Sequence, residues 1–296
     1  MKKVLKWIGI GITGLLGIIM ITAVILSFAG GSRLQTTREI RGETISIPSD
    51  ETSLARGAHL VNVACKSCHG PGLSGQPVLA DPAIGTIYAA NITGLAASHT
   101  DEEIVRAIRH AVDTDGRQLI IMPAESFIYF SEEDLGSVIA YLKQQPRVEN
   151  EIPAPELAFM GRVLLGAGLF GNVFPAEYID HGLPFPARPE IGASAAYGEY
   201  VSRFCTSCHG PDLAGAQPSD PTSPPAPNLT PGGALGEWTE ADFLSFMRSG
   251  VTPSGRQLDA AFMPWESFGK FDNAELQGLW LYLQSLPPAL VEADGR

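Results

Sequence analysis

The chain has few basic residues outside its N-terminal segment. Four of its 20 lysine and arginine residues lie within residues 1–33, which contain no acid, so the remainder carries 16 basic and 32 acidic residues, a net charge of −16. Such a surface repels the phosphates of nucleic acid and favours a basic partner, or simply keeps the domains soluble. We therefore expect no nucleic-acid partner.

Charged residues are absent from Trp7 to Ala29, 23 consecutive positions rich in Ile, Leu, Val and Gly. At about 1.5 Å per residue, this run is long enough to cross a bilayer. Three lysines precede it, which predicts a cytoplasmic N-terminus and places everything after Gly30 on the periplasmic or extracellular side of the cytoplasmic membrane. The alternative is a signal peptide cleaved before Gly30, but the hydrophobic region of a signal peptide usually spans about 7–15 residues. We favour a retained single-pass anchor over residues 1–33, with residues 7–29 in the membrane.

Cysteine is also rare, and its placement argues against disulfides. The four cysteines lie in two copies of one pentapeptide, Cys65-Lys66-Ser67-Cys68-His69 and Cys205-Thr206-Ser207-Cys208-His209. Two thiols three positions apart can each form a thioether with one haem, and the adjacent histidine can bind the iron, so the motif is typical of c-type haem attachment. A zinc site would need a fourth ligand nearby, and a thiol–disulfide pair would need a βαβ context. The sequence predicts two covalently bound haem c groups, with His69 and His209 as iron ligands.

The two pentapeptides belong to a larger internal repeat. Segments recur 139–141 residues further along the chain: Gly116-Arg117-Gln118-Leu119 with Gly255-Arg256-Gln257-Leu258, Met122-Pro123 with Met263-Pro264, and Glu125-Ser126-Phe127 with Glu266-Ser267-Phe268. Each unit of about 95 residues is enough for one small domain folded around a cofactor. We predict one domain over residues 50–146, a second over residues 191–290, and a Pro-rich linker over residues 147–190.

Each unit is predicted to contain short helices joined by long loops, and strand signals are weak. A first helix runs into the cysteine motif, a Pro- and Gly-rich loop follows the motif, a second helix starts after a threonine N-cap with an acid three residues on, and a last helix presents an apolar face. The predicted helices are Ser53–Ala64 and Ser194–Phe204, those starting at Thr100 and Thr239, and those starting at Ser131 and Asp272; the loops are Gly70–Asn91 and Gly210–Asn228.

The linker contains an apolar segment, Leu157–Phe170. Its short length and Arg162 argue against a second membrane crossing. We expect a helix packed between the two domains; the alternative is a segment that rests on the membrane or on a partner subunit.

Two methionines are candidates for the second iron ligand. Met122 and Met263 lie 53 and 54 residues after their histidines, and each is followed by proline, which favours an extended loop over a helix. The other four methionines are the start residue, an anchor residue, a linker residue and a residue on the apolar face of a predicted helix. Methionine sulfur opposite histidine raises the reduction potential and closes the iron to small ligands. We predict the ligand pairs His69/Met122 and His209/Met263.

The remaining polar candidates carry weaker predictions. Four histidines have no histidine at the matching position of the other repeat, so we expect loop or surface roles for His59, His99, His110 and His181. Arg117 and Arg256 recur and could pair with haem propionates or lie on the surface. Asn91-Ile92-Thr93 and Asn228-Leu229-Thr230 match a glycosylation sequon, but their recurrence indicates loops that shape the cofactor pocket.

Each unit resembles a class I cytochrome c domain, with Cys-x-x-Cys-His after a first helix, Met-Pro in a late loop, and a closing helix that contains Tyr141-Leu142 or Tyr282-Leu283. The resemblance implies an all-α fold of two tandem class I cytochrome c domains after an N-terminal transmembrane helix. The Asn-x-Thr loops, the Thr-capped helix and the Gly-Arg-x-Leu…Met-Pro segments also look like those in cytochrome subunits of membrane-bound alcohol, aldehyde and gluconate dehydrogenases. Those subunits typically have three haems, and this chain has two haem motifs.

The resemblance implies a dihaem electron carrier rather than an enzyme, with a membrane redox complex or a dehydrogenase subunit as its donor or acceptor. The alternative is a dihaem enzyme such as a peroxidase or a thiosulfate-oxidising cytochrome. A peroxidase needs an iron with an open or releasable position, and the paired methionines argue against one.

Overall fold

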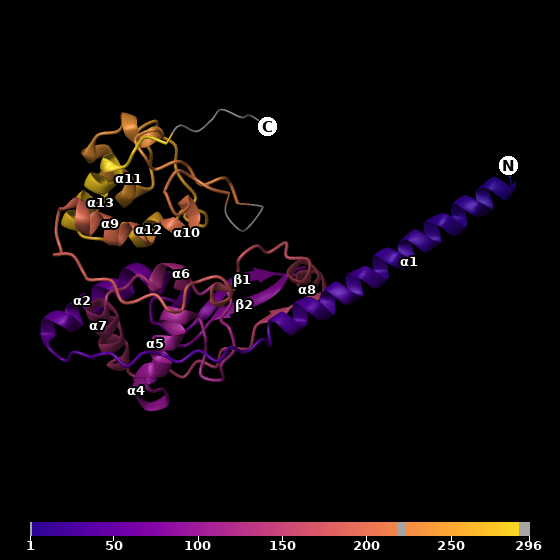
Figure 1. Cartoon of the computed structure of the whole chain (residues 1–296), viewed down its shortest axis with the longest axis horizontal. Helices are drawn as coiled ribbons and strands as arrows, with labels where there is room; N and C mark the ends of the chain where they lie inside the picture. Colours follow the sequence, from indigo (N-terminus) through magenta and orange to yellow (C-terminus); the bar gives the residue numbers. More distant parts are fainter. Residues whose placement is uncertain (1, 218–222, 290–296) are drawn as a thin grey trace.

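A computed structural model of the chain describes residues 2–217 and 223–289 (Figure 1). A long helix, α1 (Lys2–Arg33), projects from a body in which the two repeats form separate helical domains, called here domain 1 and domain 2. Within the described ranges, α1 is the helix with the length and apolar composition of a membrane span, and its apolar window is fully exposed. The predicted boundary at residue 290 and part of the second predicted loop, at residues 218–222, lie outside the described residues.

Both domains contain the predicted helices, with matching short helices between them. Domain 1 contains α2 (Glu51–Ala64), α3 (Lys66–His69), α4 (Leu95–Ser98), α5 (Asp101–His110), α6 (Ala124–Phe127) and α7 (Glu132–Lys143). Domain 2 contains α9 (Ala195–Ser202), α10 (Thr206–His209), the 3₁₀ helix η2 (Ala234–Glu237), α11 (Glu240–Ser249), α12 (Trp265–Phe268) and α13 (Asn273–Ser285). Thr100 and Thr239 each form a complete capping box with the acid at the third helical position, so the predicted helix starts are confirmed.

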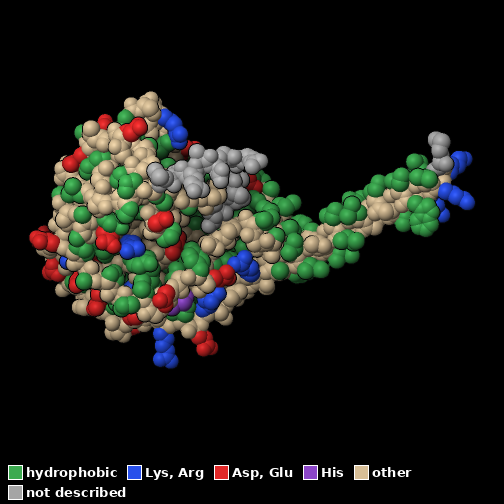
Figure 2. Space-filling view, turned by 45° about the horizontal axis from the view of Figure 1, so that its top comes forward, with side chains coloured by type: hydrophobic (Ala, Val, Ile, Leu, Met, Phe, Trp, Pro, Cys, Tyr) green, Lys and Arg blue, Asp and Glu red, His purple; other side chains and the backbone are tan. Residues whose placement is uncertain are grey.

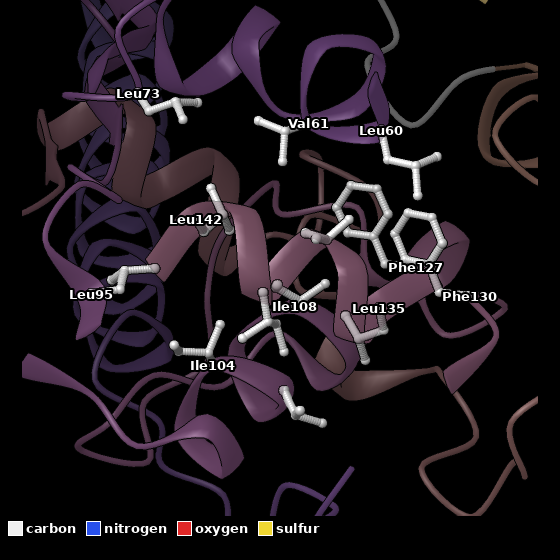
Figure 3. Packing of buried hydrophobic residues seen from close by; sticks show 13 residues of the cluster. Leu60, Val61, Leu73, Leu95, Ile104, Ile108, Phe127, Phe130, Leu135 and Leu142 are labelled. Carbon is white, nitrogen blue, oxygen red and sulfur yellow. The ribbon is translucent and has the colours of Figure 1, made fainter. Parts of the chain in front are cut away.

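The first and last helices of each domain cross at a glycine. A Cβ atom on Gly57 of α2 would lie 1.9 Å from the Ser137 carbonyl oxygen of α7, and one on Gly198 of α9 would lie 1.9 Å from the Gly278 carbonyl oxygen of α13. Only glycine therefore allows these helix pairs to approach so closely. The crossing buries the predicted apolar faces of the last helices, including Leu135, Val138, Ile139 and Leu142 of domain 1. Figure 3 shows Leu135 and Leu142 within this core.

A small sheet interrupts the helical fold of domain 1. Strands β1 (Gln76–Asp81) and β2 (Gly85–Ala89) form an antiparallel hairpin, and β3 (Glu156–Leu157) from the linker adds to its edge. The Asp81 carboxylate accepts the backbone N–H groups of Ala83 and Ile84, at 2.8 and 2.9 Å, and so closes the hairpin turn. The prediction of a loop over Gly70–Asn91 is wrong for this part of the chain. The hairpin sequence shows little alternation of apolar and polar residues. Part of the hairpin's stabilisation comes instead from the distant linker, which supplies β3.

The linker forms a helix, but not in the predicted place. Helix α8 (Phe159–Gly166) packs against the C-terminal end of α1 and against the sheet of domain 1, and the 3₁₀ helix η1 (Pro175–Glu177) follows it. The expectation that this segment packs between the two domains is wrong. Its buried Leu165 joins a cluster with Ile87 of β2 and Leu157 of β3, which holds the segment on the outside of domain 1.

The two domains meet through positions that the repeat relates to each other. His59 of α2 contacts the Glu275 carboxylate of domain 2 at 2.6 Å, and 141 residues later Tyr200 of α9 donates to the Asp134 carboxylate of domain 1 at 2.9 Å. Arg56 donates to both acids, at 3.0 Å to Asp134 and 2.8 Å to Glu275. Both carboxylates are fully buried. Equivalent positions of the two repeats thus contact each other reciprocally. The interface therefore resembles the two-fold interface of a homodimer, formed here within one chain.

An aromatic cluster lies beside this polar network. Phe204, immediately before Cys205, packs between a pair of rings from each domain, with ring centroids 5.7–6.4 Å apart; these rings are Phe127 and Phe130 of domain 1 and Phe268 and Phe271 of domain 2. At the same offset that relates His59 to Tyr200, the matching residue of domain 1 is Val63, which is buried in the core of domain 2. The domains are thus joined next to both cysteine motifs.

Candidate haem-iron centres

Each cysteine motif forms the same short turn. The His69 N–H donates to the Cys65 carbonyl at 2.9 Å within α3, and the following Gly70 has φ +81°. In domain 2, the His209 N–H donates to the Cys205 carbonyl at 2.9 Å, and the next glycine has φ +82°. A left-handed φ favours glycine, so the residue after each histidine is dictated by backbone geometry. The two copies therefore present their histidines in one conformation.

Both histidines of the motifs are buried and oriented by a backbone carbonyl. Nδ1 of His69 lies 2.8 Å from the Ala90 carbonyl oxygen, and Nδ1 of His209 lies 2.8 Å from that of Pro227. Because a carbonyl oxygen only accepts, Nδ1 carries the proton and Nε2 keeps a lone pair that can bind a metal. Burial lowers the pKa of both imidazoles, and the bond to the carbonyl opposes it only in part. Both rings are therefore neutral at neutral pH, the form that coordinates iron.

The asparagine next to each acceptor carbonyl holds that carbonyl in place. Asn91 accepts the Thr93 N–H at 3.0 Å and donates to the Val148 carbonyl at 2.8 Å. Asn228 does the same in domain 2, accepting the Thr230 N–H at 2.8 Å and donating to the Ala289 carbonyl at 2.7 Å. Each Asn-x-Thr therefore shapes the loop that orients the neighbouring histidine. This contact explains why the sequon pattern recurs.

None of the four cysteines is paired in a disulfide, as the sequence predicts. Cys65 packs against the core of domain 1, whereas Cys208 is exposed. In domain 2, Cys205 thus packs on the apolar core while Cys208 lies at the surface.

The two candidate methionines lie in the loops that the sequence predicts. Met122 packs against the same apolar core as Cys65, and Met263 packs against the same core as Cys205. Each is followed by a proline that precedes a short helix, α6 or α12. Each domain therefore holds two cysteines, a buried imidazole and a thioether, with the methionine on the same core as one cysteine. Such a donor set fits a covalently attached haem; the pairing of histidine with methionine on iron stays a prediction.

A zinc alternative finds no ligand set. Across the two described ranges, no group of three or more histidine, cysteine, aspartate and glutamate side chains is placed to hold a metal ion. A structural zinc site needs four such ligands around one point. In the described part of the chain, no further side chains complete a zinc site around either Cys-x-x-Cys-His motif.

The other recurring and unmatched polar residues divide into surface and buried groups. Arg117 is exposed and pairs with Asp115 and with Asp113, at 3.6 Å for the latter, and Arg256 is exposed. Their predicted contact with propionates stays a prediction. His99 bonds the neighbouring Ser98 hydroxyl at the domain surface, as expected.

The prediction of a loop or surface role for His110 is wrong, because the ring is almost fully buried. Its Nε2 lies 2.9 Å from the Glu43 carboxylate and its Nδ1 lies 3.0 Å from Nδ1 of His181. The neighbouring Arg109 is also fully buried and donates to Glu43 at 2.8 Å. These contacts hold the segment after α1 and the linker on domain 1. Sequence reasoning missed them, because their partners lie 66–71 residues away along the chain.

Comparison with known proteins assigns both repeats. Residues 52–142 match the family described as cytochrome c oxidase, cbb3-type, subunit III, and residues 195–287 match the family described as cytochrome c. Both repeats are cytochrome c domains. The chain accordingly carries two covalently bound haem c groups and is a dihaem electron-transfer protein. Both matched ranges fall within the predicted domains, whose outer boundaries stay predictions.

Curated relatives extend over most of the chain. The cytochrome subunit of fructose dehydrogenase from Gluconobacter japonicus is 28% identical over 90% of this chain, and the cytochrome c subunit of quinone alcohol dehydrogenase from Gluconacetobacter polyoxogenes is 27% identical over 81%. The corresponding alcohol dehydrogenase subunit from Gluconobacter oxydans is 26% identical, also over 81% of this chain. The alignments span 58%, 57% and 56% of those relatives' own lengths, so the chain covers little more than half of each.

Proposed function

We propose that the chain passes single electrons between two haem irons ligated by His69/Met122 and by His209/Met263, with thioethers to Cys65, Cys68, Cys205 and Cys208. The observation that carries this proposal is the repeated site: in both domains a buried histidine presents a free Nε2, and a methionine packs on the same core as a motif cysteine. A histidine and a methionine with purely structural roles would not need to keep this arrangement in both domains.

The protein's part in this chemistry is to orient ligands and exclude water. When bound, each haem c supplies a one-electron Fe³⁺/Fe²⁺ couple. The carbonyls of Ala90 and Pro227 accept from Nδ1 and so increase the basicity of Nε2. Met122 and Met263 would supply the second iron ligand, which would raise the reduction potential and close the iron to small ligands. This closure favours an electron carrier over a peroxidase.

We also propose that α1 anchors the chain in the cytoplasmic membrane by residues 7–29, with both domains on the periplasmic or extracellular side. Three lysines precede the apolar run, and in Figure 2 the apolar side chains cover the stalk while the basic ones mark its tip. The exposed apolar surface of α1 needs a nonpolar environment.

The partner that these observations favour is a membrane dehydrogenase subunit that donates electrons to the chain. The support comes from the relatives, which are cytochrome subunits of fructose and quinone alcohol dehydrogenases. Affinity capture from detergent-solubilised membranes should recover a dehydrogenase subunit that reduces the haems when its substrate is added. Recovery of an oxidase or reductase alone would contradict this assignment.

Replacing the methionines one at a time tests the ligand assignment. A pyridine haemochrome assay should give two covalent haems per chain in the wild type and in both Met122→Ala and Met263→Ala. Each variant should lose part of the weak near-red absorption band of ferric Met–iron ligation, because one thioether ligand is removed. Met160→Leu, in the exposed part of α8, is the control and should leave the band intact. A band unchanged in both alanine variants would refute the ligand pairs.

A further inference from the structure

Helix α8 and the residues after it present apolar side chains to the outside of the molecule. Phe159 is 48% exposed, Met160 50% and Leu169 58%. These three residues, called here the α8 patch, lie on the linker and take no part in the haem sites. Phe28, near the end of α1, is 77% exposed and lines a groove together with Phe159. In Figure 2 the apolar surface of the stalk continues onto the body where the two join.

Glycines allow α1 and α8 to cross closely, and the crossing lies at residues 26–30 of α1. A Cβ atom on Gly30 would lie 2.0 Å from the Arg162 carbonyl oxygen, and one on Gly166 would lie 2.0 Å from the Leu26 carbonyl oxygen. Small residues at such a crossing are typical of helices that pack within membranes. Arg162 Nε also donates to the Ser27 hydroxyl at 3.1 Å. Helix α8 is therefore fixed against residues 26–30.

When α1 spans the membrane, this crossing lies at the outer edge of the bilayer. About 20 helical residues cross the roughly 30 Å of hydrocarbon. The twenty residues from Trp7 end at Leu26, so residues 27–30 and the attached α8 lie at the headgroup layer. At 8 residues, α8 is too short to span the membrane but long enough to lie along its surface.

The charge at the crossing suits lipid headgroups. Within the described part of the chain, Arg162 forms hydrogen bonds to Ser27 and to the Leu157 carbonyl, and no carboxylate pairs with it. An arginine without an acidic partner beside exposed apolar side chains matches the boundary between phosphates and acyl chains. Contiguous exposed apolar side chains mark surfaces that contact a membrane or another protein.

We propose that the α8 patch inserts into the outer headgroup layer of the bilayer beside α1, as a second membrane contact of the chain. This contact holds domain 1 in one orientation relative to the membrane, because a single helix would leave the domain free to tilt toward or away from the bilayer surface. The inference rests on the proposed anchoring by α1, and its partner is the lipid surface itself rather than a second protein.

The test uses the full-length haem-loaded chain in lipid nanodiscs, with two parallel readouts by mass spectrometry. In hydroxyl-radical footprinting, Phe159 and Met160 should be protected, whereas Phe262 of domain 2, also 48% exposed, should be oxidised. With a phospholipid that carries a photoactivatable group near its headgroup, the peptide holding residues 159–169 should be labelled and that holding Phe262 should not.

The outcomes separate the inference from the anchoring. Protection of residues 159–169 without lipid labelling would mean that protein covers the patch and would overturn the inference, as would oxidation of Phe159 at the rate of Phe262. Lipid labelling by a probe in the acyl chain should reach α1 around Leu16 in either case. Failure of that control would instead refute the anchoring.

Discussion

At the scale of the residue, Glu275 shows how strongly the domain interface biases a single group. Burial by itself raises the pKa of this carboxyl, but hydrogen bonds and charge from His59 and Arg56 outweigh it and lower the pKa to about 2. Burial also raises the pKa of Asp134, but the hydrogen bond and charge of Arg56 outweigh it, so this pKa is lowered as well. Both acids are therefore charged at neutral pH when the domains are docked. Removing one partner would leave a buried charge without compensation.

We expect the Glu275 carboxylate to make the free energy of unfolding depend on pH in the acid range. The folded pKa of Glu275 is about 2 against an ordinary value of 4.5, so its contribution is complete above about pH 4.5 and is lost as the pH falls toward 2. Between pH 5 and pH 3 the free energy of unfolding should fall by about 2 kcal/mol more in the wild type than in Glu275→Gln.

Denaturant unfolding at the two pH values measures this difference. Glutamine keeps the shape of the side chain and its helix-capping bond, so the variant should fold. Glu237→Gln, at an exposed position, is the matched control and should behave as the wild type. Equal pH dependence in Glu275→Gln and the wild type would contradict the importance of the ion pair.

The residues of the sites were predictable because their chemistry is local. Cysteine and histidine within five positions predict haem attachment without knowledge of the fold, and methionine before proline predicts the second iron ligand. Arg109 and His110 were not predictable as buried groups, because their environment comes from Glu43 and the linker. A charged residue has no local signal that marks such burial.

At the scale of the element, the helix starts were predictable and the helix crossings were not. The capping boxes at Thr100 and Thr239 lie within four residues of sequence. The hairpin of domain 1 escaped prediction because β3 reaches it from the linker, more than 60 residues away. Glycine in a helix likewise has no readable role until the crossing helix is known, as Gly30 and Gly166 show.

The glycine crossing of α1 and α8 should not tolerate a methyl group. Gly30→Ala places a Cβ atom against the Arg162 carbonyl, an overpacking that costs about 1–3 kcal/mol, whereas Gly17→Ala meets nothing within 4 Å. Amide hydrogen exchange of α8 in micelles should accelerate by roughly ten- to a hundredfold in Gly30→Ala and stay unchanged in Gly17→Ala. Unchanged exchange in both variants would show that α8 does not depend on this crossing.

At the scale of the whole molecule, the docking of the two domains sets how the two sites lie. Phe204 and Val63 stand one and two residues before the cysteine motifs, and each packs against the opposite domain. The polar network of Arg56, Asp134 and Glu275 lies beside them. The same positions of both repeats thus serve as one interface, so the distance between the two sites is held by buried contacts rather than by the linker alone.

We expect Phe204→Ala to loosen this docking. The partly buried ring contacts four others, so its loss should destabilise the interface toward the lower end of about 3–5 kcal/mol. Small-angle X-ray scattering should show a larger radius of gyration, and unfolding should split into two transitions. Phe262→Ala, at an exposed position of domain 2, should change neither. A compact variant with one transition would show that the polar network alone holds the domains.

The sequence by itself determined the two haem motifs, the duplication, the candidate anchor and the starts of the main helices, because each depends on residues within a few positions or on an exact repeat. Only the tertiary structure decided where the linker helix packs, that His110 is buried, and that His59 meets Glu275 across 216 residues. Such contacts depend on how two folded surfaces fit together. Local patterns do not encode that fit, since the same apolar or charged residue suits either a surface or an interface until its partner is in place.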